Sequence, residues 1–85
     1  MTIYRIIETT NENFKKDFNR GTAFIINRVG KNEGILEMTH IIPETRELIP
    51  CNTWLTSTLV KVEETTFTIT FFTRNSVYIF LKEVL

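Results

Sequence analysis

Residues 66–81 decide the fold of this chain: they read T-F-T-I-T-F-F-T, then R-N, then S-V-Y-I-F-L. In the first part, Phe67, Ile69 and Phe71 alternate with threonines, a period of two that places apolar groups on one face of a β-strand and hydroxyls on the other. Arg74 and Asn75 leave room only for a tight turn before the chain runs back. The stretch therefore predicts a β-hairpin.

The second strand of this hairpin is apolar on both faces. Val77 and Ile79 lie on one side, and Tyr78 and Phe80 lie on the other. A domain of this size has one core to offer, so the second face needs a partner chain, a ligand or the chain's own helix as a cover. We interpret this face as a contact between chains and predict a homo-oligomer, with interface residues Phe72, Tyr78 and Phe80.

Composition favours a small β-rich domain without a basic excess. The chain has 85 residues, is rich in Thr, Ile and Val, and contains seven Phe, which suits pleated sheet. Ten basic and ten acidic side chains cancel. Because duplex-binding domains carry a basic excess to replace counterions, this balance disfavours general nucleic-acid binding, although a local basic patch remains open.

Cysteine content and the chain start point to the cytosol. One cysteine, Cys51, excludes an intrachain disulfide and suits a reducing compartment. The opening residues M-T-I-Y-R-I-I-E do not resemble a signal peptide, and no apolar stretch approaches the roughly 20 residues of a membrane helix. We expect a cytoplasmic protein, in the host cytoplasm if it is encoded by a phage.

The segment after the first strand predicts one short helix. Thr9-x-x-Glu12 fits a capping box, in which the hydroxyl and the carboxylate each take up a free backbone amide. Phe14 and Phe18 are four residues apart and give the helix a narrow apolar stripe for docking on the sheet. Gly21 is expected to end the helix.

The strands are short and closely connected. The prolines that bracket P-E-T-R-E-L-I-P, residues 43–50, favour an irregular crossing that turns Leu48 and Ile49 inward. Strands are expected at residues 3–8, 22–28, 35–42, 59–62, 66–73 and 76–81, and the helix near residues 10–20.

These elements predict a single domain, residues 1–85, that is mainly β with one helix (α+β). The expected architecture is a small antiparallel sheet curled into an open barrel or roll of five to six short strands. A βαββ layered sheet with the helix on one face is the alternative.

Catalytic and metal-binding patterns are missing from the sequence. His40 and Cys51 lack the paired spacing of zinc ligands, and the glycines Gly21, Gly30 and Gly34 fall in turns and form no phosphate loop. We interpret His40 as the end of a strand and Cys51 as a small, partly buried residue. We therefore expect no enzyme, no cofactor and no metal site.

Two polar segments form the candidate ligand site. One is Thr56-Ser57-Thr58, before the strand that contains Leu59, and the other is Arg74-Asn75-Ser76 in the last turn. If the strands beside them pair, their hydroxyls, amide and guanidinium could hold a phosphate or carboxylate. Ordinary turn chemistry, in which Ser, Thr and Asn bond nearby backbone, is the alternative. The candidate ligand-binding residues are Trp54, Thr56, Ser57, Arg74, Asn75 and Ser76.

Aromatic side chains suggest a second binding mode. The aromatic residues considered are Trp54, Tyr78 and Tyr4, because aromatic rings beside Arg and Lys can stack nucleobases in single-strand-binding barrels. A single tryptophan in a small β domain is more often part of a core or an interface.

The C-terminal third resembles small uncharacterised β proteins of phages and bacterial mobile elements. The resemblance covers about thirty residues and is carried by T-S-x-L-V at 56–60 and T-x-N-S-x-Y at 73–78. It implies a mobile-element origin, where small inhibitors of host defence are common products, and no established activity.

The function expected from the sequence is non-enzymatic binding. The leading hypothesis is a phage-type inhibitor or sponge that binds a host protein or a small nucleotide-like ligand. The alternatives are a single-stranded nucleic-acid-binding barrel and a structural or assembly subunit.

Overall fold

The computed structural model describes residues 1–84, including every side chain except those of Pro50 and Cys51. Over these residues the chain forms six strands, one α-helix and one short 3-10 helix. In chain order they are β1 (Thr2–Thr9), α1 (Glu12–Asp17), β2 (Ala23–Val29), η1 (Lys31–Glu33), β3 (Ile35–Ile42), β4 (Glu47–Glu64), β5 (Thr68–Thr73) and β6 (Val77–Val84).

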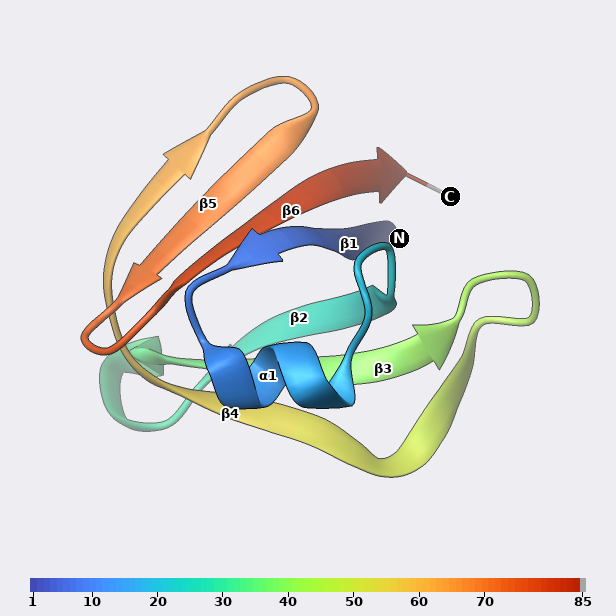
Figure 1. The fold of residues 1–85 in the computed structure, drawn as a ribbon, viewed down its shortest axis with the longest axis horizontal. Helices are drawn as coiled ribbons and strands as arrows, with labels where there is room; N and C mark the ends of the chain where they lie inside the picture. The colour runs from blue at the N-terminus through green and yellow to red at the C-terminus, as the bar shows by residue number, and fades with distance from the viewer. Residues whose placement is uncertain (85) are drawn as a thin grey trace.

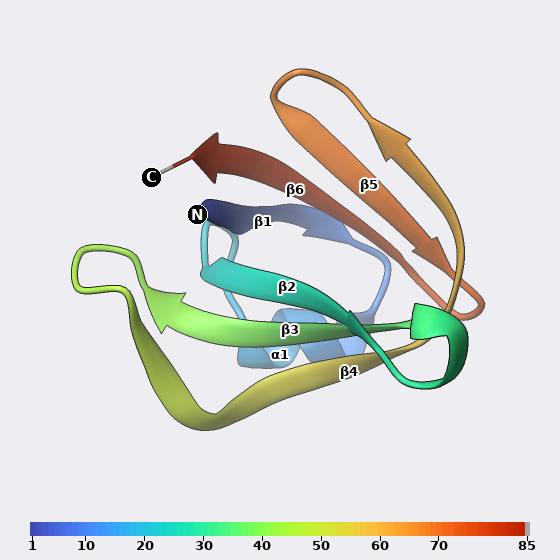
Figure 2. The same ribbon diagram turned by 180° about the vertical axis from the view of Figure 1, so that it is seen from behind.

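The strands form a closed antiparallel barrel in which each strand pairs with the next, and β6 pairs with β1 (Figures 1 and 2). The closing seam runs from Thr2 opposite Val84 to Thr9 opposite Tyr78, and it brings the two ends of the chain side by side. The mainly β fold with one short helix is confirmed. The barrel is closed by this β1–β6 pairing and is not open as expected, and the layered βαββ alternative does not apply.

Helix α1 packs against the barrel through its phenylalanines, as expected. In both views it lies along one side of the strands (Figures 1 and 2). Phe14 is fully buried, with its ring centroid 5.6 Å from that of Phe24 in β2, 5.3 Å from Trp54 in β4 and 5.4 Å from Tyr78 in β6. The helix thus closes part of the barrel with apolar rings.

The helix does not begin with the capping box that the sequence suggested. Its N-cap is Asn11, whose Oδ1 accepts a hydrogen bond from Phe14 N at 3.0 Å. The hydroxyl of Thr9 instead accepts from Asn11 N and donates to Val77 O, because Thr9 still belongs to β1. Asn is among the best N-cap residues, so the local preference was correct and its position was two residues off.

Gly21 does not end the helix either, because α1 finishes at Asp17. Gly21 has a φ of 91° and donates its N–H to Ile6 O at 2.7 Å. Its freedom of backbone conformation is used to bring the chain from the helix back to the barrel.

The interior face of the last hairpin comes from alternate residues of both strands. Ile69 and Phe71 of β5 point into the core as expected, and so do Tyr78 and Phe80 of β6, which are 1% and 0% exposed. The interface assignment of Tyr78 and Phe80 is therefore wrong. Their face of β6 is the inside of the barrel, and the chain covers it with its own strands and helix.

Strand β4 is much longer than the sequence suggested. It starts at Glu47, so the irregular crossing expected at residues 43–50 is wrong in its second half. Leu48 pairs with Ile41 but Thr53 pairs with Thr39, which leaves extra β4 residues around Pro50 in a bulge. A bulge tolerates a proline because the ladder hydrogen bond is already absent there. Leu48 is 57% exposed and does not point inward.

Candidate functional site

The two polar segments predicted to form a site lie side by side. Asn75 N donates to Ser57 Oγ at 3.2 Å, and Arg74 N donates to Thr58 O at 2.9 Å. These bonds attach the β5–β6 turn to the neighbouring strand β4. The pairing of β4 with β5, which places Leu59 opposite Thr73, determines this approach.

The turn itself differs from the expected geometry. A two-residue hairpin turn usually requires a positive φ at one or both positions, but neither Arg74 nor Asn75 has one. Thr73 N donates to Ser76 O at 2.8 Å, and the Thr73 hydroxyl accepts from Ser76 N at 3.2 Å. The side chain of Thr73 thus replaces a backbone acceptor, which lets the turn close with ordinary backbone angles.

The hydroxyl groups of the site serve mainly the fold. Thr56 is buried, and its Oγ1 accepts from Leu36 N at 3.2 Å and donates to Ser57 O at 2.8 Å. The Ser57 hydroxyl is occupied by Asn75 N. These contacts match the turn-chemistry alternative for Thr56 and for the oxygen of Ser57, whose hydroxyl proton is still a donor.

Arg74 is the group that remains available. It is exposed, and within residues 1–84 its guanidinium takes part in no ion pair or hydrogen bond. A planar guanidinium presents several donors in a fixed fork that matches carboxylate or phosphate. The chemistry left at this end of the barrel is therefore recognition of an anionic group by Arg74.

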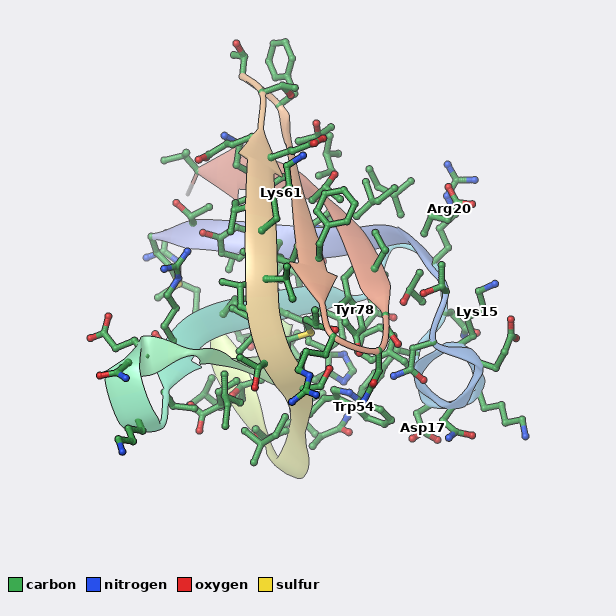
Figure 3. All side chains as sticks on the ribbon, turned by 90° about the vertical axis from the view of Figure 1, so that its left-hand side faces the viewer. Lys15, Asp17, Arg20, Trp54, Lys61 and Tyr78 are labelled. Carbon is green, nitrogen blue, oxygen red and sulfur yellow. The ribbon has the colours of Figure 1, made fainter. Side chains whose placement is uncertain are left out.

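A small cleft lies beside this turn. It has a volume of about 200 Å³ and is lined by Asn11, Trp54, Leu55, Thr56, Ser57, Asn75, Ser76 and Tyr78. Trp54 and Tyr78 lie near the β5–β6 turn in Figure 3. Asn11 was missed from the sequence. Its Nδ2 donates to Tyr78 Oη at 3.0 Å, and its N-cap position was the signal that could have revealed it.

The aromatic rings proposed for base stacking are engaged inside the protein. The Trp54 ring meets Phe14 edge-on, and Tyr4 contacts Phe71 and Phe80 with centroid distances of 6.5 and 6.2 Å. Tyr78 is buried. These three side chains therefore match the core interpretation more closely than a stacking platform.

Phe72 is the one predicted interface residue that lies outside the core. It is partly exposed on β5, and Lys61 Nζ lies 5.6 Å above its ring. Lys61 also forms an ion pair with Glu63 at 2.7 Å. The outer surface of β4 and β5 around Phe72 therefore combines an apolar ring with charged side chains.

His40 has a structural environment. Its Nδ1 lies 2.8 Å from Asn52 Nδ2, and its ring lies 5.9 Å from the centroids of both Phe18 and Phe24. Burial lowers the pKa of His40 below the ordinary value of 6.5. Among the described residues no cluster of His, Cys, Asp or Glu could hold a metal ion. The Cys51 side chain lies outside the described residues.

Comparison with known proteins gives no relative. No protein-family model, no curated protein and no solved structure matches the chain. Within residues 1–84 no helix is long and apolar enough to cross a membrane.

Proposed function

We propose that this chain is a non-enzymatic binding protein that contacts a protein partner through the barrel end around Arg74. The proposal rests on the contact between the β5–β6 turn and β4, in which Asn75 N donates to Ser57 Oγ. This contact holds the turn in place while the side chain of Arg74 stays exposed. A charged group held on a fixed turn is suited to anchor an acidic side chain of a partner.

The size of the cleft favours a protein over a small ligand. Pockets for small molecules are roughly 300–1,000 Å³. The cleft beside Arg74 has about 200 Å³, which is too small for a nucleotide. A partner surface can instead place one side chain in the cleft and lie across Trp54 and Asn75.

The class of partner follows from the resemblance of the C-terminal third to phage β proteins. It supports a host defence component as the target, with this chain as its inhibitor in the host cytoplasm. Single-strand binding and a purely structural role are the alternatives. The first gains no support from Trp54, Tyr78 and Tyr4, whose rings pack against other rings of the barrel.

The proposal includes self-association. Because Tyr78 and Phe80 are buried, the contact between chains is assigned to another surface. Phe67 and Val84 are 69% and 82% exposed, and both line a cleft of about 380 Å³ between the β4–β5 turn, β1 and β6. Exposed apolar groups gathered around one cleft are typical of a contact surface. This surface lies at the far end of β5 from Arg74 (Figure 1).

Site-specific photocrosslinking tests the protein-binding proposal. A photoreactive phenylalanine analogue replaces Asn75 in one variant and Asn27, an exposed residue of β2, in a matched control. We expect a discrete protein adduct from position 75 in host cells and none from position 27. Equal adducts from both positions would reject the proposed surface, and an adduct removed by nuclease would reject a protein as the partner.

Arg74→Ala then measures the charged contact. With the crosslinked partner purified, binding should weaken by on the order of a hundredfold if Arg74 forms a desolvated charged hydrogen bond worth about 2–3 kcal/mol. Arg28→Ala, an exposed arginine of β2, is the control and should bind like the parent chain. Unchanged binding of Arg74→Ala would move the contact away from this turn.

A further inference from the structure

A cleft larger than the one beside Arg74 lies between α1 and β1, away from the Arg74 turn. It has a volume of about 500 Å³, which falls in the range of roughly 300–1,000 Å³ typical of small-molecule pockets. It is lined by Ile6, Ile7, Glu8, Thr9, Lys15, Phe18, Asn19 and Arg20. By size alone, this cleft can hold a ligand that the Arg74 cleft cannot.

The floor of the cleft is apolar and closely packed. Ile6 and Phe18 are 3% and 7% exposed and belong to the main core of the barrel. The ring of Phe18 is fixed against Phe14 and Phe24, with centroid distances of 4.8 and 5.0 Å. A preformed apolar floor of this kind can take the apolar part of a ligand without rearrangement.

A β-bulge runs along the wall of the cleft. Ile6 pairs with Phe80 and Glu8 pairs with Ile79, so Ile7 is an extra residue without a partner in β6. The extra residue of a bulge is left out of the ladder, and bulges are frequent beside functional sites. The wall therefore combines the Ile7 side chain with backbone polar groups.

Two cations stand at the rim. Lys15 of α1 and Arg20 of the following loop both line the cleft, and both project on the helix side of the molecule in Figure 3. Lys15 has only a long contact with Glu12, at 3.6 Å between exposed side chains. Glu8 is the one carboxylate among the lining residues, so the rim carries a net positive charge.

We propose that this cleft binds a small amphipathic anion, with its apolar body on Ile6 and Phe18 and its phosphate, sulfonate or carboxylate group between Lys15 and Arg20. The amide of Asn19, which also lines the cleft, supplies a further donor. The site is independent of the protein-binding surface around Arg74.

A matched pair of fluorescent probes tests the proposal. 1-Anilinonaphthalene-8-sulfonate has an apolar body and one anionic group, and N-phenyl-1-naphthylamine is its neutral counterpart. A K15Q/R20Q double variant should weaken binding of the sulfonate about tenfold, because an exposed ion pair contributes a few-fold each. The neutral probe should bind this variant and the parent chain alike.

Removing the negative charge of Glu8 should have the opposite effect on sulfonate affinity. Glu8→Gln removes the carboxylate and should tighten sulfonate binding by about twofold to fivefold. R28Q/K31Q, which removes the same charge on the side of β2 and η1, is the control and should leave sulfonate affinity within twofold of the parent. Circular dichroism of each variant confirms that the probe reports on folded protein.

Amide chemical shifts of the parent chain locate the site without any substitution. Titration of the ¹⁵N-labelled protein with the sulfonate should move the amide signals of Ile7, Asn19 and Arg20 first. Shifts centred on Trp54 and Asn75, or equal sulfonate binding by K15Q/R20Q and R28Q/K31Q, would overturn the proposal.

Discussion

At the scale of single residues, the core position of Phe80 has the largest predicted consequence. Its side chain is fully buried, and its ring contacts Phe24 and Phe71 with centroid distances of 6.1 and 5.9 Å. Phe80→Asp leaves a cavity and an unpaired charge in the barrel, so it should cost at least about 4 kcal/mol of the free energy of unfolding. Urea denaturation followed by circular dichroism measures this loss.

Leu48→Asp is the control for that substitution. Leu48 is 57% exposed at the start of β4, so the same acidic replacement should cost within about 1 kcal/mol. A folded, stable Phe80→Asp protein would mean that this face of β6 is outside the barrel after all. The sequence could not decide between the two faces of β6, because both carry apolar residues at a period of two.

The second prediction at this scale concerns His40 and pH. Burial lowers its pKa in the folded protein below the ordinary value of 6.5, so the unfolded chain takes up a proton first as the pH falls. Stability is therefore full above about pH 6.5 and decreases as the pH falls from there through the lower folded pKa. Protonation would also oppose the contact of Nδ1 with Asn52 Nδ2.

Melting temperatures between pH 7.5 and 5.5 test this dependence. His40 is the only histidine of the chain, and no other side-chain type ordinarily titrates in this window. We expect the melting temperature to fall with pH in the parent chain and to fall less in His40→Gln. An identical slope in both proteins would contradict the assignment to His40.

At the scale of elements, Asn11 joins the helix to the barrel. Its Oδ1 caps Phe14 N, and its Nδ2 donates to Tyr78 Oη in β6. Asn11→Ala removes both bonds and should cost about 1–2 kcal/mol, because a lost N-cap alone typically costs about 1 kcal/mol. Asn13→Ala, an exposed change inside the same helix, should be neutral or slightly stabilising.

Hydrogen exchange separates the two roles of Asn11. The amides of α1 should lose protection in Asn11→Ala before those of β6, because the cap acts on the helix directly. Unchanged protection of α1 would show that Asn11 stabilises the protein only through Tyr78.

Element boundaries follow from the sequence wherever one face of a strand is polar. The range 35–42 agrees with β3, and the pairing of the Thr56 and Arg74 segments follows from adjacent strands. The first part of β4 was missed because Pro43 and Pro50 argue against a strand there. Only the pairing of Leu48 and Thr53 with β3 reveals a bulge between them. The sequence could not single out Lys15 and Arg20 as a pair of cations, since the cleft between them depends on where α1 docks.

In the β5–β6 turn, glycine at position 75 is expected to destabilise the protein, although Asn-Gly is a favoured sequence in two-residue hairpin turns. Because neither Arg74 nor Asn75 has a positive φ, Asn75→Gly gains no relief of strain and adds entropy to the unfolded chain. It should lower stability by about 0.5–1 kcal/mol, measured by thermal unfolding. A higher melting temperature would indicate a left-handed residue in this turn.

At the scale of the whole molecule, closure of the barrel decides which kind of contact can join two chains. The strand ladders run around a complete ring, so pairing between exposed sheet edges is not the natural route to an oligomer. The closure of the barrel could not be predicted from the sequence. The β1–β6 seam joins residues from the two ends of the chain, and no local sequence pattern indicates such a pairing. Contact between chains then depends on exposed apolar side chains, of which Phe67 and Val84 share one cleft.

Light scattering after size exclusion tests whether this end of the barrel holds two chains together. At tens of micromolar we expect a mass above that of one chain for the parent, and a return toward the monomer for Phe67→Asp, because a charge on an apolar contact is left unpaired. Val60→Asp is the matched control. Val60 lies in β4, outside this cleft, and is 68% exposed, so the variant should keep the parent mass. If the parent chain is strictly monomeric, the Phe67 cleft is a free surface. If Val60→Asp dissociates the chains while Phe67→Asp does not, the contact lies on the outer face of β4, next to Lys61 and Phe72.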